Sequence, residues 1–355
     1  MPLATCRCGC GTEVTRAFAP GHALVHARNL RRRAQDGDYY ARREMYEYGW
    51  ALNATRTPGV RAFGFEAEFY GMSQGNAVEN LRASGIDAQD DGYHHNTRPY
   101  WRVTEDGSVS GEGCELVSPV LHLSKKDDIS LGRKALRAIR QNGGQINATC
   151  GLHVHHNLRG KTAIDLAETV GHWALFQPII NRVLPRSRHN GMYCQSMYDP
   201  QSWFNGVITR ASSSGRAVDV RGDYFGRYHA INLQSISAHG TAEYRQHSGT
   251  LNGNKFEHWV RFTRAMHDVA RIGSMQTLLD VYGGVSGVQR DMGVADMMKY
   301  LALPKATRAF YESREVELRS HSDDEGADEQ ACDSEPVYDE NGNVWCDNCD
   351  EYHDE

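Results

Sequence analysis

Acidic and histidine side chains recur at alternate positions in four short stretches of the sequence. These side chains are Glu66 and Glu68, Glu115, His153 and His155, and Glu243 followed by Arg245. Residues two apart in a β-strand point to the same face of a sheet, so each pair would present its polar groups together. Carboxylates with an imidazole form a hard ligand set that suits Mg²⁺ or Mn²⁺ better than structural zinc. Such cations beside an arginine can stabilise a transferring phosphoryl group.

Each pair by itself also has an ordinary structural explanation. A Glu-x-Glu stretch is often a solvent-facing strand edge, and two histidines can lie on the open face of a sheet. An Arg two residues after a Glu can be an exposed ion pair worth less than about 1 kcal/mol. Glutamates that face each other on neighbouring strands repel, however, unless a cation lies between them. The recurrence of these pairs therefore favours one shared cation site.

Apolar residues that alternate with these polar ones predict the strands that carry them. In residues 60–70, Phe63, Phe65, Ala67 and Phe69 share one face, opposite Glu66 and Glu68. Further strands are predicted at residues 93–103, 114–120 and 144–158, and a hairpin joins residues 228–236 to 241–248.

Helical patterns separate these strands. They cover residues 29–53, 73–84 (ended by Gly85), 127–139 (with Asp127 and Asp128 as caps), 163–184 (interrupted at Pro178) and 254–272. Residues 186–226 show no period and predict a long functional loop. Strands grouped with helices of this kind indicate an α+β fold.

Five motifs, in order, resemble the amidoligase family of carboxylate–amine ligases, which are related to glutamine synthetase and glutamate–cysteine ligase. The motifs are Gly64–Phe69, Glu115–Pro119, Cys150–Leu158, Arg227–Leu233 and Gly240–Leu251. The resemblance covers roughly residues 60–275. The start of the chain, with Cys6, Cys8 and Cys10, also looks like a small cysteine motif of phage and bacterial proteins.

The resemblance implies a curved antiparallel sheet with helices packed on one face, as in the catalytic fold of glutamine synthetase. Its concave face would hold ATP and two or three Mg²⁺ or Mn²⁺ ions. Carried over by position, the metal ligands would be Glu66, Glu68 and Glu115, with His153 and Glu243 completing a second site. Arg245 would stabilise the transferring phosphoryl group, and Glu66, His153 and Glu243 would share in catalysis.

Other residues in the matching motifs would contact the ligands. His155, Asn232 and Arg227 would contact nucleotide or substrate, together with Arg245. Asp106 and Ser108 match a family turn expected at the substrate end.

The implied chemistry joins a small-molecule or peptide carboxylate to an amine. ATP would convert the carboxylate to an acyl phosphate, and the amine would then displace phosphate. Cys150 is expected to be buried, and neither Cys114 nor Cys194 has an evident base partner, so no dedicated nucleophile is predicted. Two alternatives stay open: a metal-dependent hydrolase that uses His153 and His155, and a catalytically inactive binding module.

Cysteines and histidines cluster at both ends of the chain. Potential zinc ligands are Cys6, Cys8, Cys10 and His22 at the start, and Cys332, Cys346, Cys349 and His353 at the end. A reduced, metal-free turn is the alternative for the first group. We expect residues 1–30 to form a Cys/His-rich segment, residues 31–320 the catalytic domain, and residues 321–355 an acidic linker with a Cys-rich tail.

Composition limits the partners. The 355 residues carry a net charge of −6 and contain no apolar run long enough to span a membrane, so neither nucleic acid nor a membrane is expected as a partner. Nine cysteines without disulfide-like spacing fit the reducing cytoplasm. The Cys-rich ends could support a homo-oligomer or bind a partner protein.

Overall fold

The structure, a computed structural model, describes most of the chain between residues 61 and 320. The described residues are 4–5, 13–14, 33, 61–90, 92, 97–111, 113–158, 161–197, 226–320, 337–338 and 344–345. The eight predicted zinc ligands, the helix predicted at 29–53 apart from Arg33, and most of the loop predicted at 186–226 lie outside them. At the two ends, β1 (Ala4–Thr5) pairs with β2 (Glu13–Val14), and β11 (Val337–Tyr338) pairs with β12 (Val344–Trp345).

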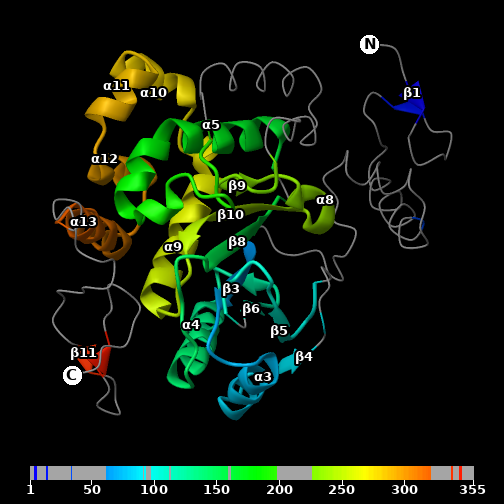
Figure 1. Cartoon of the computed structure of the whole chain (residues 1–355). Coiled ribbons are helices and arrows are strands. Elements are labelled where there is room, and N and C mark those ends of the chain that lie inside the picture. The colour runs from blue at the N-terminus through cyan, green and yellow to red at the C-terminus, as the bar shows by residue number, and fades with distance from the viewer. Residues whose placement is uncertain are drawn as a thin grey trace.

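A central sheet organises the described part of the chain (Figure 1). Its strands are β3 (Ala62–Phe69), β4 (Ala88–Asp90), β5 (Trp101–Glu105), β6 (Cys114–Val117), β7 (Leu121–His122), β8 (Gly151–Asn157), β9 (Ile231–Asn232) and β10 (Thr241–Ser248). Their spatial order is β4-β5-β6-β3-β8-β10-β9, with β7 paired to β3 beside β6. The strands from distant parts of the chain thus meet at β3 and β8 in the middle.

The sheet is open and mostly antiparallel, as the sequence predicts for an α+β fold. The exception is β4, which runs parallel to β5. Residues 91–100 connect these two strands, and a connection of this length can carry the chain back to start a parallel neighbour instead of a tight hairpin. The antiparallel arrangement that the resemblance implies is therefore present in most of the sheet, with β4 at its edge as the exception.

Helices cover the apolar face of the sheet. They are α3 (Gln74–Ala83), α4 (Lys126–Gln141), α5 (Ala163–Ile180) and α9 (Gly253–His267). The ring centroids of Phe65 on β3 and Phe256 on α9 lie 4.5 Å apart. Those of Tyr244 on β10 and Trp173 on α5 lie 5.3 Å apart. Gly132 lets α4 approach closely, since a Cβ there would lie 2.8 Å from the Phe256 ring. Burial of these large side chains is the main source of stability.

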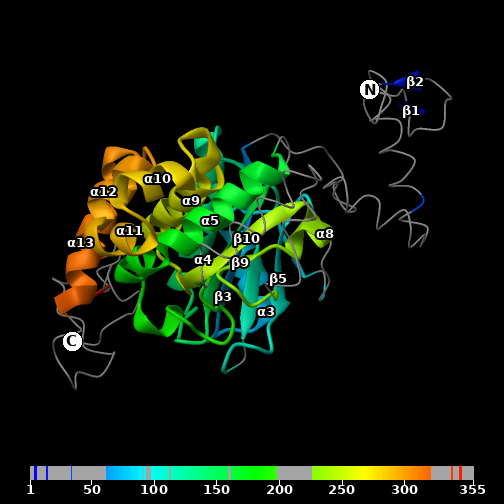
Figure 2. The same cartoon turned by 90° about the horizontal axis from the view of Figure 1, so that it is seen from above.

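Four further helices follow α9 and pack beside α5 and α9 (Figure 2). They are α10 (Met275–Tyr282), α11 (Val285–Asp291), α12 (Val294–Tyr300) and α13 (Lys305–Ser320). Tyr311 on α13 is buried against Phe262 of α9, with ring centroids 5.5 Å apart. None of the helices in the described ranges is both long and apolar enough to cross a membrane.

Several predicted element bounds need correction. Residues 146–150 are not a strand: Gln145 forms a single bridge to Tyr70, and the chain then turns at Asn147 before β8 begins at Gly151. Asp128 does not cap α4, because its carboxylate accepts a hydrogen bond from the His122 amide instead. Both differences arise from contacts with residues distant from the predicted pattern.

Two more corrections concern α5 and the hairpin. Pro178 lies inside α5 and does not interrupt it; the helix runs to Ile180 and continues as a short 3₁₀ turn, Asn181–Val183. The predicted strand at residues 228–236 is reduced to β9, because α8 (Ser235–His239) occupies the end of that segment. Gly240 ends α8 in the left-handed conformation, with φ of 69°, and leads directly into β10.

Candidate active site

Strand register places the predicted polar residues on one face, opposite the helices. Glu66 on β3 pairs with His153 on β8, and Glu68 on β3 pairs with Glu115 on β6. His155 on β8 pairs with Glu243 on β10. Directly opposed residues in an antiparallel pair point to the same side, so five strands contribute to one polar surface once Asn232 on β9 is included.

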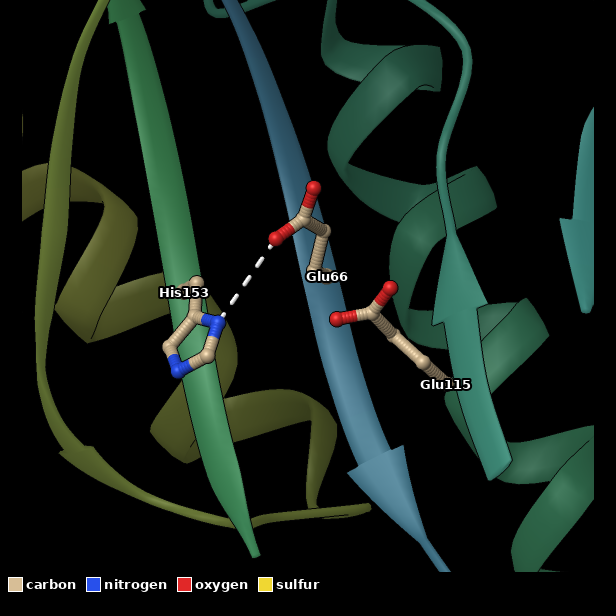
Figure 3. Close-up of side chains that lie close together, drawn as sticks. All are labelled: Glu66, Glu115 and His153. Atoms are coloured by element: carbon tan, nitrogen blue, oxygen red, sulfur yellow. Dashed lines mark ion pairs between the residues drawn. The ribbon is translucent and has the colours of Figure 1, made fainter. Parts of the chain in front are cut away.

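His153 lies at the centre of this surface, surrounded by carboxylates (Figure 3). Its Nδ1 lies 3.6 Å from Oε2 of Glu66 and 3.7 Å from Oε1 of Glu243. Its Nε2 lies 3.6 Å from Oε1 of Glu68. In Figure 3 the Glu66 carboxylate is directed at His153, and the Glu115 side chain extends from the neighbouring strand toward β3. The convergence predicted from separate strands is therefore present.

Three overlapping groups of these residues could each hold a cation. The groups are Glu66, Glu115 and His153; Glu66, His155 and Glu243; and Glu68, Asp106 and Glu115. Within each group the potential ligand atoms lie within 4.8 Å of one another. Glu66 and Glu115 each belong to two groups, so neighbouring cations would share carboxylates.

The charges in the site perturb one another strongly. Burial, followed by repulsion from Glu66 and Glu68, raises the pKa of Glu115 well above its ordinary value. Burial opposes ionisation of Glu66 as well, yet attraction to His155 and His153 holds its pKa well below the usual range. The pKa of Glu66 is thus lowered while that of its neighbour Glu115 is raised. This difference indicates that the carboxylates carry more negative charge than the nearby histidines can balance.

The spacing and the unpaired atoms fit a cation. Separations of 3.5 to 3.7 Å between imidazole nitrogens and carboxylate oxygens exceed ordinary hydrogen-bond lengths. Ligand bonds of about 2.1 Å place adjacent ligands about 3 Å apart and opposite ligands about 4 Å apart, which brackets these values. Nδ1 of His153 and Nε2 of His155 are buried and have no hydrogen-bond partner among the described residues. The donor set and its geometry therefore suit Mg²⁺ or Mn²⁺.

Glu68 and Glu243 are oriented by hydrogen bonds. The amide of Gly151 donates to Oε2 of Glu68 at 2.6 Å. Nδ2 of Asn232 donates to Oε2 of Glu243 at 2.6 Å, and the Arg245 guanidinium donates to Oε1 of the same carboxylate. Burial opposes ionisation of Glu243, but Arg245 and His155 lower its pKa, so this carboxylate stays charged.

The turn that carries Asp106 lies beside the carboxylates. Oδ1 of Asp106 accepts hydrogen bonds from the amide and hydroxyl of Ser108, at 2.8 and 2.7 Å. The same turn is fixed to the loop before β8, because the Ser110 amide donates to Thr149 and Asn147 donates to the Ser110 carbonyl. Asp106 thereby joins Glu68 and Glu115, and Ser108 orients it. Contact of either residue with substrate stays a prediction.

The structure brings additional residues to the polar face. Arg188, which is buried, donates from Nη2 to the Arg245 carbonyl at 2.8 Å, and its charge favours ionised Glu68. On β5, Arg102 and Thr104 occupy the same face, and Thr104 pairs with Glu115. Alternation in residues 101–105 could have indicated Arg102 and Thr104. Arg188 lies in a segment without periodicity, so the sequence carried no signal for it.

The other residues predicted to contact nucleotide or substrate are Arg245, Arg227 and Asn232, and they differ in burial and in their hydrogen-bond partners. Arg245 is buried at the site, and its Nε donates to the Tyr193 carbonyl at 3.2 Å. Arg227 is exposed, with its guanidinium 5.1 Å from the centre of the Tyr228 ring. Asn232 uses both ends of its amide within the protein, since Oδ1 accepts from the Gln234 amide. The structure therefore shows Asn232 orienting Glu243, while nucleotide contacts of Arg227 and Asn232 stay predictions.

Comparison with known proteins assigns the family. Residues 60–267 match the family described as "Putative amidoligase enzyme", and this match covers more than half of the chain. The chain therefore belongs to this amidoligase family, as the motifs predict. A comparison with curated proteins finds no match. The matched region runs from β3 to α9 and includes all the acidic, histidine and arginine residues that the structure places at the polar face.

Proposed function

We propose that the protein is an ATP-dependent carboxylate–amine ligase that forms an amide bond through an acyl phosphate. The observation that carries the proposal is the set of three overlapping cation-binding groups around His153, with Arg245 at their edge. Family membership supports a ligase-type enzyme in general. The paired carboxylates and the neighbouring guanidinium support phosphoryl transfer as its chemistry.

The residues present fit two or three Mg²⁺ or Mn²⁺ ions. Glu66, Glu68, Glu115, His153 and Glu243 would hold them, with Asp106 as an additional oxygen ligand beside Glu68 and Glu115. Bound cations would neutralise the crowded charge of the ATP phosphates and of the acid substrate. Without such cations the carboxylates would repel a triphosphate, so the acidic face by itself cannot account for nucleotide binding.

The chain's own residues would order the reaction. The substrate carboxylate attacks the γ-phosphorus of ATP, ADP leaves, and the amine then attacks the carbonyl carbon and displaces phosphate. Arg245 would stabilise the negative oxygens during both transfers, because its guanidinium is held in place by Glu243 and by the Tyr193 carbonyl. The acidic face would attract a cationic amine, and one of its carboxylates would accept the proton that the amine must lose.

The cysteines support a route without a covalent enzyme intermediate. Cys114, Cys150 and Cys194 are all buried. Burial raises the pKa of the Cys150 thiol to about 12, so its thiolate is scarce at neutral pH. An acyl phosphate requires no such nucleophile.

An isotope experiment tests the proposal. Purified protein is incubated with ATP, Mg²⁺ and a panel of amino acids, peptides and polyamines, and phosphate release is measured with each acid–amine pair. For an active pair, a carboxylate labelled with ¹⁸O should transfer one label to the released phosphate. The matched control is Glu66→Gln, which should release phosphate about 10³-fold more slowly.

Two outcomes would contradict the proposal. Cleavage of an amide in the absence of nucleotide would favour the metal-dependent hydrolase. Failure to bind Mg-ATP, in protein whose folding is confirmed by circular dichroism, would favour a catalytically inactive binding module.

A further inference from the structure

The two ring nitrogens of His155 have different surroundings. Nδ1 lies 3.0 Å from the Thr241 hydroxyl and 3.2 Å from the Ser235 hydroxyl, and these two hydroxyls lie 2.6 Å apart. The ring of His239 packs edge-on against the imidazole, with centroids 5.7 Å apart. The ring orientation is therefore fixed from one side by two hydroxyls and an aromatic neighbour.

The opposite nitrogen, Nε2, faces the carboxylates. It lies 3.5 Å from Oε2 of Glu66, and Glu66, His155 and Glu243 form one of the three groups of potential ligands. The Nε2 atom is buried and has no hydrogen-bond partner within the described part of the chain. His153, which is 3% exposed, points its own unpaired Nδ1 between the same two carboxylates. A buried polar atom without a partner needs an explanation, and a cation held between the facing carboxylates provides one at these two nitrogens.

We propose that His155 is a cation ligand through Nε2, held in place by the hydroxyls of Ser235 and Thr241. In this arrangement Nδ1 carries the proton and donates a hydrogen bond to one of the two hydroxyls. The lone pair of Nε2 is then directed at the carboxylates. A partner that fixes the far nitrogen is the usual companion of a metal-binding histidine. The assignment deepens the proposed function and rests on it, and it replaces the nucleotide contact predicted for His155.

The consequence concerns which metal each group prefers. The group of Glu66, His155 and Glu243 includes a nitrogen donor, whereas the group of Glu68, Asp106 and Glu115 offers only oxygen. Imidazole favours first-row transition ions over Mg²⁺, and an all-oxygen set suits Mg²⁺. The protein therefore should hold Mn²⁺ at the group of Glu66, His155 and Glu243 even when Mg²⁺ is in excess.

Local structure explains how the two hydroxyls meet. Ser235 is the first residue of α8 and Thr241 the first of β10, and the left-handed Gly240 turns the chain sharply between these elements. Thr241 pairs with Asn157 across β8, which places its side chain on the same face as His155 two residues away. The short helix is therefore part of the site.

The test measures Mn²⁺ binding to the full chain without nucleotide. Free Mn²⁺ is counted by electron paramagnetic resonance in excess Mg²⁺, and nitrogen coupling from the imidazoles is recorded by electron spin-echo modulation. Thr241→Val combined with Ser235→Ala removes both hydroxyls and should weaken Mn²⁺ binding about 10- to 100-fold. Thr241→Ser keeps a hydroxyl and should restore binding to near the wild-type level.

His155→Gln sharpens the test, because it removes the nitrogen donor and keeps a neutral polar side chain. We expect it to weaken the preference for Mn²⁺ over Mg²⁺ and to remove one of the nitrogen couplings, while the coupling from His153 remains and the all-oxygen group still binds Mg²⁺. Folding of every variant is checked by circular dichroism, and Ser235→Ala alone replaces the double variant if that one does not fold.

Two results are distinguishable. If wild-type protein binds Mn²⁺ but the hydroxyl and His155 variants bind it equally well with unchanged nitrogen coupling, the assignment of His155 is overturned and the ligase proposal stands. If wild-type protein binds neither Mn²⁺ nor Mg²⁺, both are overturned.

Discussion

The two faces of the central sheet use histidine in opposite ways, and the neighbours His155 and His156 show the contrast. His155 points to the polar face, where attraction to Glu66 outweighs burial and raises its pKa. His156 points to the apolar face, where burial lowers its pKa well below the ordinary value and Nε2 lies 2.9 Å from the Thr263 hydroxyl. The face to which an imidazole points, not its position in the sequence, therefore decides the direction in which its pKa is shifted.

The faces also divide stability and function. The apolar face is closed by α3, α4, α5 and α9. Both ring nitrogens of His267 are paired there, with the Tyr244 hydroxyl at 3.1 Å and the Asn157 carbonyl at 3.1 Å, whereas Nδ1 of His156 has no hydrogen-bond partner among the described residues. The polar face differs in its set of mutually repelling carboxylates. Proteins commonly accept such local violations at functional sites, while the rest of the fold compensates for them.

Among the substitutions on the polar face, that of Glu66 should cause the largest loss of activity. Glu66→Gln takes one carboxylate from two of the three groups that could hold a cation. We expect ligase activity to fall about 10³-fold, which corresponds to about 4 kcal/mol of lost transition-state stabilisation. Phosphate release with the active substrate pair and Mn²⁺ binding together measure the effect. Unchanged Mn²⁺ affinity would show that Glu66 is no ligand.

Arg245→Lys tests the cationic edge of the same face. Lysine keeps the charge but lacks the planar guanidinium, which donates hydrogen bonds to Glu243 and to the Tyr193 carbonyl at the same time. Activity should fall about 10²-fold, or about 3 kcal/mol, with cation binding nearly unchanged. Steady-state kinetics and Mn²⁺ titration check this. Equal losses in both measurements would assign Arg245 to holding Glu243 only.

A fall in pH should reduce the folding stability of the protein through buried histidines on the apolar face. Burial lowers the pKa of His247 to about 3, so the unfolded chain takes up its proton first, near pH 6.5. Its stabilising contribution is complete above that pH and is lost as the pH falls toward the folded pKa. Each such histidine contributes a slope of about 1.4 kcal/mol per pH unit.

Urea unfolding between pH 6.5 and 5 measures this slope in wild-type protein and in His247→Gln. The raised pKa of Glu115 and Glu68 acts in the opposite direction, so the difference between the two proteins isolates the histidine. The variant should show the smaller fall in stability with acid, and identical slopes would contradict the buried, neutral state of His247.

Ser108→Ala should have a smaller effect than the preceding changes. The serine does not belong to the cation-binding groups, but its amide and hydroxyl fix Asp106. Loss of the hydroxyl should reduce Mg²⁺ affinity about tenfold, with Ser108→Thr as the matched control that keeps it. Calorimetric Mg²⁺ titration measures the affinity. A lower apparent affinity for the acid substrate with unchanged Mg²⁺ binding would instead support the predicted substrate contact.

Much of this division between faces could be predicted from the sequence. Alternation assigned Phe63, Phe65, Ala67 and Phe69 to one face and Glu66 and Glu68 to the other, because the two-residue period of a strand is fixed by its geometry. The same rule placed His153 and His155 together. The family motifs gave the order of the strands along the chain, and residues 60–267 match that family.

Other features depend on contacts that no local pattern encodes. Arg188 reaches the site through bonds to the backbone of β10, and backbone acceptors carry no sequence signature. Asp106 joins Glu68 and Glu115 because Asn147 and Thr149 hold its turn from a distant loop. The parallel pairing of β4 with β5 likewise has no signature in the residue types of the two strands.

Glu66 belongs to two of the three groups of potential ligands, so two cations bound at these groups would share its carboxylate. The first ion would then make this carboxylate a poorer donor for the second, but would also reduce the repulsion among the other glutamates. The balance sets a coupling free energy, and reciprocity requires each ion to change the affinity of the other by the same factor. Metal titrations of this protein should therefore follow a cooperative or anticooperative curve instead of a sum of independent hyperbolas.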